Sequence, residues 1–488
     1  MGILAFLILF LLLQHTTPAH VCDNNAQITI QHDDPLGVFY PELLGSNLQW
    51  TDKGDGLWTS DGTLQPSALE AVKRLPVAPL RFPGGKLAST YRWRDAVGPL
   101  KERRDGLDFL GNLQRSVVGT DEFLHLLTQL KTTGIFTCNI MDPASDAAAW
   151  LAYIQEKTSD VVPRWEVGNE SYLPLDPSYM TAVNYAEKCK DIIEVLHAVK
   201  KDVKVGAILE GSLINVPWAT SIMPEAHKWN HNVITTVKDV ADFYSVHLYA
   251  PLNHSGTYQD MVRAIQTAPL ALGKNLEKVS GLVQQFAPGK ELWVTEFNLG
   301  TDNAQDNWRY GVSLAQAGYV AQMLLQFCRH NVRGATYWSL IGNHNFGMIK
   351  NSDNPRLRPA GLLYTMMAEL VGGTALKTTV DTCVMQYPVL GNVIENLNPA
   401  IVDAQAFDKN GTCYLLAINR MPDATAVLSF RDEKNLPLQV KTATLLFGGN
   451  PLDSNENEDN VQLQDAALKD GQLELPACAI ALVRFVSR

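Results

Sequence analysis

The sequence predicts an α/β protein in which a (β/α)8 barrel is followed by a C-terminal antiparallel β-sandwich. Between residues 43 and 372, short apolar runs alternate with longer segments whose apolar residues recur every three or four positions. This alternation indicates buried parallel strands followed by amphipathic helices. After residue 372 the helical periodicity stops, and short strands separated by Asn, Asp, Gly and Pro take its place. That second pattern is typical of an antiparallel sandwich.

Eight strand–helix units account for the barrel. The strand candidates are residues 43–49, 79–83, 135–141, 164–168, 203–209, 243–248, 291–296 and 334–340. The helical segments are residues 121–133, 144–156, 179–199, 258–286, 312–330 and 361–371. A (β/α)8 barrel takes ~250 residues, so this region also has room for insertions. A doubly wound sheet is the alternative, but no Gly-x-Gly-x-x-Gly motif follows the first strand.

The chain divides into four parts. We expect a signal peptide over residues 1–19, an N-terminal strand region over residues 20–41, the barrel over residues 42–374 and the sandwich over residues 375–488. The sandwich strands are predicted at residues 413–419, 424–430, 440–447 and 477–486. Residues 27–31 are strand-like and precede the barrel, so we expect them to join the sandwich and to connect the two domains.

The first residues have the pattern of a secretory signal. An apolar run over residues 3–13 is too short to span a bilayer but fits a signal-peptide core. The small residues Thr17 and Ala19 suit cleavage after Ala19. We therefore expect a protein that is extracellular or periplasmic and has no membrane association once the signal is removed.

The composition excludes several other classes of protein. Hydrophobic residues make up 46% of the chain and charged residues 19%, which is a globular composition. A net charge of -11 argues against nucleic acid as a partner. The seven cysteines show no Cys-x-x-Cys or zinc spacing, and no Gly-rich phosphate loop is present. We therefore predict neither a metal nor a cofactor, and the oligomeric state stays open.

Two of the predicted strands end on glutamates. Residues 165–170 read Trp-Glu-Val-Gly-Asn-Glu, and residues 293–298 read Trp-Val-Thr-Glu-Phe-Asn. Glu170 follows the fourth strand and Glu296 ends the seventh, so both fall at the barrel face that holds active sites. Two carboxyl groups that flank a glycosidic bond are what its hydrolysis requires. Two unrelated strand-end ion pairs are the alternative.

Polar and aromatic residues end other strands of the barrel. Asn169 can offer its amide to a sugar hydroxyl. His247 and Tyr249 close the sixth strand, where the alternation of a strand points both side chains to one face. Arg81 closes the second strand and Trp338 the eighth. For these residues the alternative is a structural role, as a core side chain or as a buried ion pair.

These motifs resemble the clan A glycoside hydrolases, which retain anomeric configuration. Within the clan, residues 81–85 (Arg-Phe-Pro-Gly-Gly), 91–95 (Tyr-Arg-Trp-Arg-Asp) and 98–99 (Gly-Pro) are similar to glycoside hydrolase family 51. That family comprises α-L-arabinofuranosidases and some endoglucanases, with a barrel followed by a β-sandwich. The resemblance implies a carbohydrate substrate and no cofactor.

The resemblance also implies roles for individual residues. Glu170 would be the acid/base and Glu296 the nucleophile. Tyr249 would bond the nucleophile, Arg81 would lower its pKa, and Trp338 would be a platform for the sugar.

The chain departs from the family at two places. Lys86 stands where the family has an Asn, and residues 44–48 stand where it has a Glu-His pair. Both lie where the terminal sugar would bind, and a Lys there favours an acidic sugar. Endo-β-glucanase, β-xylosidase and β-glucuronidase activities therefore stay open beside arabinofuranosidase. A non-catalytic carbohydrate-binding protein is the alternative from another class, but its usual mark, loss of a catalytic carboxylate, is missing.

Overall fold

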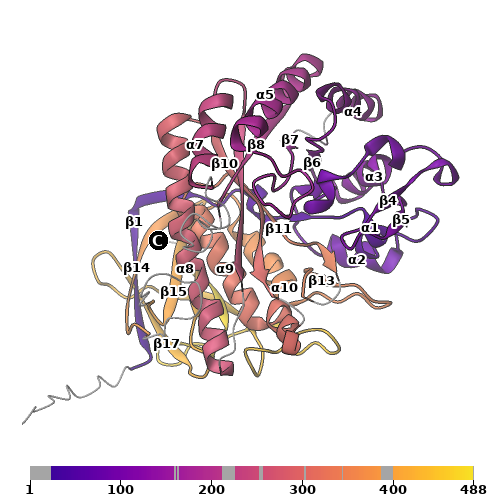
Figure 1. The fold of residues 1–488 in the computed structure, drawn as a ribbon. Helices are drawn as coiled ribbons and strands as arrows, with labels where there is room; N and C mark the ends of the chain where they lie inside the picture. The colour runs from indigo at the N-terminus through magenta and orange to yellow at the C-terminus, as the bar shows by residue number, and fades with distance from the viewer. Residues whose placement is uncertain are drawn as a thin grey trace, which may run out of the picture.

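A computed structural model gives the architecture of the chain. It describes residues 23–486 except 159–160, 162–163, 212–225, 252–256, 302–303, 343–344 and 386–398. The predicted signal peptide, residues 1–19, lies outside the described residues. The predicted fold class is confirmed, because eight parallel strands close into a barrel and a separate nine-stranded sheet follows it (Figure 1).

One strand of the barrel lies in each of the eight predicted strand regions. The barrel strands are β2 (Gly45–Asn47), β3 (Leu80–Phe82), β6 (Gly134–Cys138), β7 (Arg164–Val167), β8 (Lys204–Leu209), β9 (Phe243–Pro251), β10 (Glu291–Gly300) and β11 (Gly334–Tyr337). They close in the order β10-β11-β2-β3-β6-β7-β8-β9. Strands β9 and β10 run past their predicted ends, and the extension of β9 carries Tyr249.

Helices surround the barrel. They are α1 (Thr51–Asp55), α2 (Pro66–Lys73), α3 (Thr120–Leu130), α4 (Ala144–Lys157), α5 (Ala182–Val199), α7 (Ala226–Val237), α8 (Tyr258–Phe286), α9 (Leu314–Arg329) and α10 (Pro359–Met367). Short 3-10 turns are η1 (Pro41–Leu44), η2 (Lys86–Ser89), η3 (Trp93–Ala96), η4 (Leu100–Glu102), η5 (Ala304–Val312) and η6 (Ala368–Leu370). The Thr181, Thr257 and Ser313 side chains cap α5, α8 and α9 by accepting backbone N–H groups of the first turn.

The second domain is one curled sheet that includes the N-terminal strand. Its strands are β1 (Asn25–Val38), β14 (Thr374–Thr382), β15 (Val402–Lys409), β16 (Thr412–Asn419), β17 (Ala426–Asp432), β18 (Val440–Phe447), β19 (Gln462–Asp465), β20 (Leu473–Leu475) and β21 (Ile480–Phe485). Their order is β19-β18-β21-β16-β15-β14-β1-β17-β20. Strand β1 pairs antiparallel with β14 and parallel with β17, so one pair departs from the predicted antiparallel pattern. In Figure 1, the indigo β1 lies beside β14 although the barrel separates them in the sequence.

Two small ribbons lie outside the main sheets. Strands β4 (Asp105–Leu107) and β5 (Leu113–Arg115) form an antiparallel hairpin after barrel strand β3. Strands β12 (Ile341–Gly342) and β13 (Ile349–Lys350) pair after β11.

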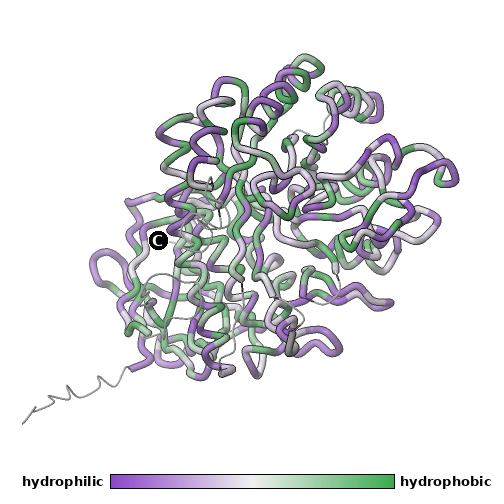
Figure 2. The backbone as a smooth tube through the Cα atoms, in the orientation of Figure 1, coloured by the Kyte–Doolittle hydropathy of each residue, from purple (hydrophilic) through white to green (hydrophobic). Residues whose placement is uncertain are grey.

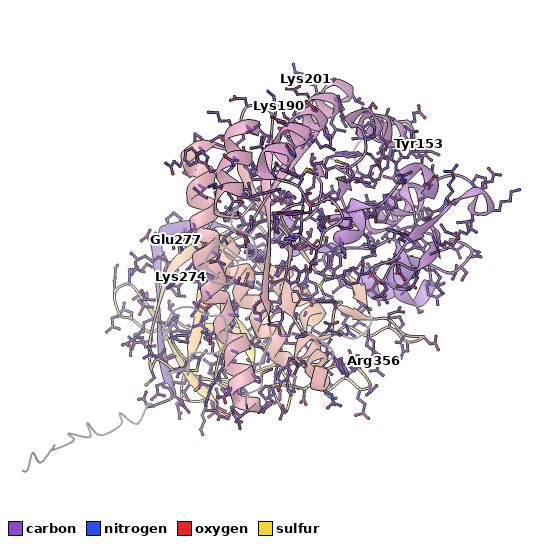
Figure 3. All side chains as sticks on the ribbon, viewed as in Figure 1. Tyr153, Lys190, Lys201, Lys274, Glu277 and Arg356 are labelled. Atoms are coloured by element: carbon purple, nitrogen blue, oxygen red, sulfur yellow. The ribbon has the colours of Figure 1, made fainter. Side chains whose placement is uncertain are left out.

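Buried ion pairs join the barrel to the sheet. Asp403 of β15 accepts from Arg329 of α9 over 3.0 Å and from Arg420 over 2.9 Å. Arg358, at the start of α10, bonds Glu456 of the sheet domain over 2.6 Å. The charged side chains labelled on α8, Lys274 and Glu277, instead project outward (Figure 3). The two domains therefore share a polar junction with buried charges.

Hydropathy follows these layers. Hydrophobic segments gather in the barrel strands, whereas the outer helices alternate between hydrophilic and hydrophobic turns (Figure 2). Among the described residues, no helix combines the length and the apolar character needed to cross a bilayer.

Candidate active site

The two predicted catalytic glutamates meet at the carboxyl ends of the barrel strands. Glu170 lies three residues past the end of β7, and Gly168, with φ at 75°, makes the turn that leads to it. Glu296 lies within β10. One oxygen of each carboxylate and one ring nitrogen of His247 all lie within 4.8 Å of one another. The carboxyl groups of retaining glycosidases lie ~5–5.5 Å apart, and those of inverting enzymes ~6.5–9.5 Å. The distance between the two oxygens is therefore closer to the retaining range than to the inverting one.

A β-bulge in β10 sets the direction of Glu296. The register of β10 against β9 shifts between Val294, which pairs with Val246, and Glu296, which pairs with His247. A bulge places one extra residue on its strand and breaks the alternation of side chains. As a result, the consecutive residues Thr295 and Glu296 both bond groups inside the barrel, namely Glu166 and Arg81.

Arg81 is the centre of the hydrogen-bond network. Its Nη1 donates to Glu296 Oε1 over 2.9 Å and to Asn47 Oδ1 over 2.9 Å. Its Nη2 donates to Asn169 Oδ1 over 3.0 Å. The side chain is fully buried, so each of its donors needs a partner from the protein. The structure thus places Arg81 in direct contact with the predicted nucleophile.

Glu166 was not among the predicted site residues. Its Oε2 accepts from Arg81 Nε over 2.7 Å, and its Oε1 accepts from Ser245 Oγ and Thr295 Oγ1, each over 2.6 Å. The Glu166 side chain is fully buried. Burial raises its pKa, but the charges of Arg81 and His247 and the two hydroxyl donors outweigh burial, and the net pKa is lowered. Glu166 is therefore a buried anion that holds Arg81 from the side away from Glu296.

Tyr249 and His247 complete the surroundings of the two catalytic candidates. Tyr249 Oη donates to Glu296 Oε2 over 2.8 Å. His247 Nδ1 lies 2.9 Å from Glu170 Oε1 and 3.8 Å from Glu296 Oε1. The strand alternation of β9 thus brings both side chains to the barrel mouth, where His247 lies between the two glutamates.

Opposing effects act on the pKa of Glu296. Burial raises it most, His247 and Arg81 lower it, and the neighbouring Glu170 raises it again. Arg81 thus lowers the pKa of Glu296, as the resemblance implies, but burial and Glu170 outweigh it and the net direction is upward. The physical reason is that Arg81 divides its charge between Glu296 and Glu166, and that Glu296 is 6% exposed.

His247 is poised to carry a positive charge. Burial lowers its pKa, but the carboxylates of Glu296 and Glu170 outweigh burial and the net pKa is raised. The two carboxylates therefore favour the charged form of the buried His247 imidazole.

The ligand atoms of Glu170, His247 and Glu296 lie close enough together to hold a metal ion. His247 Nδ1 is hydrogen-bonded to Glu170 Oε1, and Arg81 Nη1 donates to Oε1 of Glu296. A fixed guanidinium on a ligand oxygen disfavours a cation there. The donor set suits proton transfer between carboxyl groups better than metal chemistry.

Trp338 lies against the glycine turn that follows β3. Gly84 and Gly85 have φ values of 63° and 62°, and a Cβ at Gly85 would collide with the Trp338 indole. Only glycine therefore allows this close approach. Trp338 is half-buried, which leaves part of the ring accessible, as the predicted platform role requires.

Asn169 and Lys86 both contact other side chains of the protein. Asn169 is 1% exposed, and its Oδ1 accepts from Arg81 while its Nδ2 lies 3.5 Å from Asp176 Oδ2. Its amide is therefore engaged with the protein. Lys86, the first residue of η2, places its ammonium 5.0 Å from the centre of the Phe109 ring.

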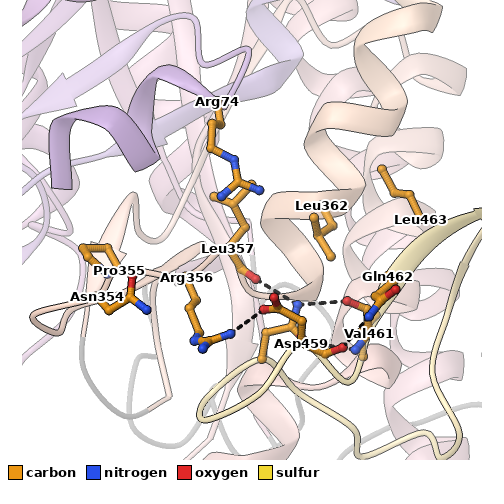
Figure 4. Close-up of a pocket in the computed structure, with 11 residues that line it drawn as sticks. Arg74, Asn354, Pro355, Arg356, Leu357, Leu362, Asp459, Val461, Gln462 and Leu463 are labelled. Carbon is orange, nitrogen blue, oxygen red and sulfur yellow. Dashed lines mark hydrogen bonds and ion pairs between the residues drawn. The ribbon is translucent and has the colours of Figure 1, made fainter. Parts of the chain in front are cut away.

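A separate pocket lies away from the catalytic candidates. It has a volume of about 510 Å³ and is lined by α2, α10 and the sheet domain around an Arg356–Asp459 ion pair of 2.7 Å (Figure 4). None of the predicted site residues lines it. This pocket therefore belongs to the junction of the domains and not to the barrel mouth.

This constellation, two close glutamates on a (β/α)8 barrel, is similar to that of the retaining glycoside hydrolases. A family model described as Alpha-L-arabinofuranosidase 1 domain matches residues 71–161. The chain is 30% identical over 252 residues to a probable alpha-L-arabinofuranosidase C of Aspergillus terreus, which covers 48% of each chain. It is 24% identical over 249 residues to an intracellular exo-alpha-(1->5)-L-arabinofuranosidase of Acetivibrio thermocellus, which covers 46% of this chain and 48% of that protein. The chain thus matches about half the length of these curated relatives.

Solved structures match nearly the whole chain. A GH51 arabinofuranosidase from Xanthomonas axonopodis pv. citri has a TM-score of 0.81 at 18% identity and covers 95% of this chain and 100% of its own. An α-L-arabinofuranosidase from Thermotoga maritima, solved with arabinose, has a TM-score of 0.78 at 21% identity, with 95% and 100% covered. The predicted resemblance is therefore confirmed: the chain is similar in sequence to α-L-arabinofuranosidases over 48% of its length, and in fold to a GH51 arabinofuranosidase over 95% of it.

Proposed function

We propose that this protein is a retaining glycoside hydrolase that releases α-L-arabinofuranosyl units by double displacement. The observation that carries the proposal is the placement of Glu170 and Glu296, whose oxygens lie within 4.8 Å of each other. Arg81 and Tyr249 each bond a different oxygen of Glu296, as an attacking carboxylate needs. The arabinofuranosyl assignment rests on the names of the similar proteins.

The first chemical step forms a glycosyl ester. A Glu296 oxygen attacks the anomeric carbon while Glu170 gives its proton to the leaving oxygen, and the glycosidic bond breaks. Negative charge leaves Glu296 as the ester forms and appears on Glu170 as it loses its proton. His247, which lies between them, contacts both carboxylates throughout.

The second step hydrolyses the ester. Glu170, now a carboxylate, removes a proton from water, and the resulting hydroxide attacks the anomeric carbon from the face that the leaving group vacated. Glu296 leaves as a carboxylate, and its charge is again stabilised by Arg81 and Tyr249. Two inversions give net retention of configuration.

A panel of aryl glycosides tests the proposal. Purified protein would be assayed on α-L-arabinofuranoside, β-xyloside, β-glucoside and β-glucuronide, and on β-glucan. We expect the arabinofuranoside to be cleaved fastest, and we expect Glu296→Ala to remove at least 10³-fold of kcat. Glu474→Ala, an exposed glutamate on β20, is the matched control and should keep full activity. Equal activity of Glu296→Ala and wild type would overturn the role of Glu296. Cleavage of the glucuronide alone would overturn the substrate choice.

We also propose that the protein is secreted after removal of residues 1–19. The apolar run over residues 3–13 supports this proposal. Sequencing the N-terminus of protein expressed in a secreting host should give His20 as the first residue. An intact Met1 in protein that stays inside the cells would contradict it.

A further inference from the structure

The turn that follows β3 leads from the catalytic network to the rim of the barrel mouth. A Cβ at Gly84 would lie 3.5 Å from Asn47 Oδ1, the atom that accepts from Arg81. Gly85 lies against the Trp338 indole. Lys86 follows directly, so its side chain starts beside the predicted sugar platform.

Lys86 carries a charge that the protein does not neutralise by an ion pair. Its ammonium lies over the Phe109 ring, 5.0 Å from the ring centre. Across the described residues, no carboxylate lies within ion-pair distance of Lys86. Lys86 is half-buried, so part of the residue packs against the protein.

Phe109 is an aromatic ring displayed to solvent on a fixed support. It is 65% exposed, in the turn between β4 and β5. The hairpin rests on Trp50, because a Cβ at Gly106 would overlap that indole, and Gln114 Oε1 accepts from the backbone N–H of Asp52 over 2.8 Å. The aromatic face therefore does not depend on a free loop for its position.

The carboxylate beside Phe109 is engaged within the hairpin. Asp108 Oδ1 accepts from the backbone N–H groups of Leu110 and Asn112, and its Oδ2 accepts from Gln114. These bonds use the carboxylate inside the hairpin. What remains at the rim is one cation beside one exposed aromatic face.

We infer that Lys86 and Phe109 form a binding subsite for a sugar that carries an anionic group, a carboxylate or a sulfate ester, next to the catalytic pocket. This inference deepens the proposed function and rests on it. An aromatic face packs against the apolar face of a sugar ring, and an ammonium without a carboxylate partner binds an anion by a charge-assisted hydrogen bond.

The charge of the site makes such a cation necessary for an anionic ligand. The protein has a net charge of -11, Glu170 and Glu296 lie together at the barrel mouth, and Glu166 is buried beside Arg81. Arg81 is committed to Glu166 and Glu296. A substrate with its own negative charge therefore needs a further cation, and Lys86 supplies it.

Equilibrium binding tests the subsite without turnover. Sodium D-glucuronate, D-glucose 6-sulfate and D-glucose would be titrated by calorimetry into the full chain, at low and at high salt. We expect one or both anionic sugars to bind at least about tenfold more tightly than glucose, and the preference to fall as salt rises. Preference for only one of the two anions identifies the natural group.

Variants assign the preference to the two residues. Lys86→Met keeps the unbranched stem that packs on Phe109 and should abolish the preference, as should Lys86→Gln if the methionine variant is poorly folded. Phe109→Leu should weaken all three sugars. Lys441→Met, an exposed lysine on β18, is the control and should keep the wild-type preference. No preference in wild type, or a full preference in folded Lys86 variants, overturns the subsite.

Failure of the proposed function and failure of the subsite give different experimental results. Hydrolysis of neutral aryl α-L-arabinofuranoside reports on the proposed function, whereas the calorimetric preference reports on the subsite. Preference without hydrolysis of any substrate would support the subsite and overturn the proposed function. Hydrolysis without preference would leave the function standing and overturn the subsite.

Discussion

Arg81 Nε donates to Glu166 Oε2 over 2.7 Å, while Nη1 of the same guanidinium donates to Glu296 Oε1 over 2.9 Å. One buried cation is thus shared between a structural carboxylate and the proposed nucleophile. Removing one member of a buried ion pair is costly because its partner stays buried and uncompensated. The sharing also limits how far Arg81 can lower the pKa of Glu296.

Glu166→Gln tests this sharing. The substitution removes one negative charge and keeps the size of the side chain, so Arg81 acts on Glu296 alone. We expect the pKa of Glu296 to fall. The acid limb of the pH profile, which is the range where kcat/KM declines as pH falls, should therefore move to lower pH. We expect the variant to lose about 3 kcal/mol of unfolding free energy, because Arg81 loses a buried partner. The pH profile of kcat/KM and the thermal midpoint measure the two effects.

Ser245→Ala is the control for that experiment. It removes a hydroxyl that bonds Glu166 but keeps both charges. Its acid limb should stay closer to that of wild type. An acid limb in Glu166→Gln at the wild-type pH, in a folded protein, would contradict the electrostatic role and leave only a structural one.

Tyr249→Phe removes the hydroxyl that donates to Glu296 Oε2. A hydrogen bond to a charged group contributes ~1.5–3 kcal/mol, so we expect kcat/KM to fall about 10–100-fold. The carboxylate loses a donor that favours its ionised form, so the acid limb should also move to higher pH. Tyr179→Phe, an exposed tyrosine in the loop after Glu170, should leave both quantities unchanged. A loss of activity with no shift of the acid limb of kcat/KM would show that Tyr249 does not set the pKa of Glu296.

His247→Asn tests the electrostatic effect of the imidazole that lies between the two glutamates. The positive charge of His247 lowers the pKa of Glu296, whose net direction is already upward. Glu296 must be ionised to attack, so activity is lost as pH falls through its pKa. Without His247 that pKa rises, and the acid limb should move to higher pH, opposite to the shift in Glu166→Gln. Steady-state kinetics across pH would measure it, and a shift toward lower pH would refute the assignment of a positive charge to His247.

Asp403 joins the two domains, and its pKa gives a second pH dependence. Burial raises this pKa, but Arg329 and Arg420 outweigh burial and the net pKa is lowered. A lowered pKa in the folded state contributes stability above the unfolded value of ~3.9, and this contribution is lost as pH falls through the folded pKa.

Asp403→Asn should therefore destabilise the protein at neutral pH by about 3 kcal/mol and flatten the loss of stability below pH ~4. Denaturant unfolding at several pH values would measure both effects. Asp423→Asn, an exposed aspartate, should change the unfolding free energy by less than about 0.5 kcal/mol. Equal losses in the two variants would show that the junction does not depend on this pair.

The barrel could be predicted because its strands are short apolar runs with turn residues at both ends. Each of the eight predicted regions holds one barrel strand. The ends of the strands were less predictable. Strands β2 and β3 are three residues long each, whereas β10 extends to Gly300. The parallel pairing of β1 with β17 could not be predicted, because no hairpin links those strands and only packing sets their direction.

Some residues of the site could be predicted from the sequence and others could not. Glu170, Glu296, Arg81, His247 and Tyr249 could be placed together because parallel strands end at one face of a barrel. Glu166 could not, since it stands in an apolar run and looks like part of the strand core. The bulge at Thr295 was also invisible, because it depends on the register between β9 and β10. Three barrel strands each carry a polar residue within an apolar run, namely Glu166, Ser245 and Thr295. This shared feature of the sequence is the signal that would have indicated the buried network.

The identity of the nucleophile is the central claim, and trapping the glycosyl ester tests it most directly. Glu170→Ala would be mixed with an aryl α-L-arabinofuranoside whose leaving group needs no acid, so the first step proceeds and the second is slow. Intact mass and peptide mapping would then follow the protein. We predict an adduct of one anhydro-pentosyl unit on the peptide that contains Glu296. An adduct on another residue, or release of sugar with inverted configuration and no adduct, would contradict the account.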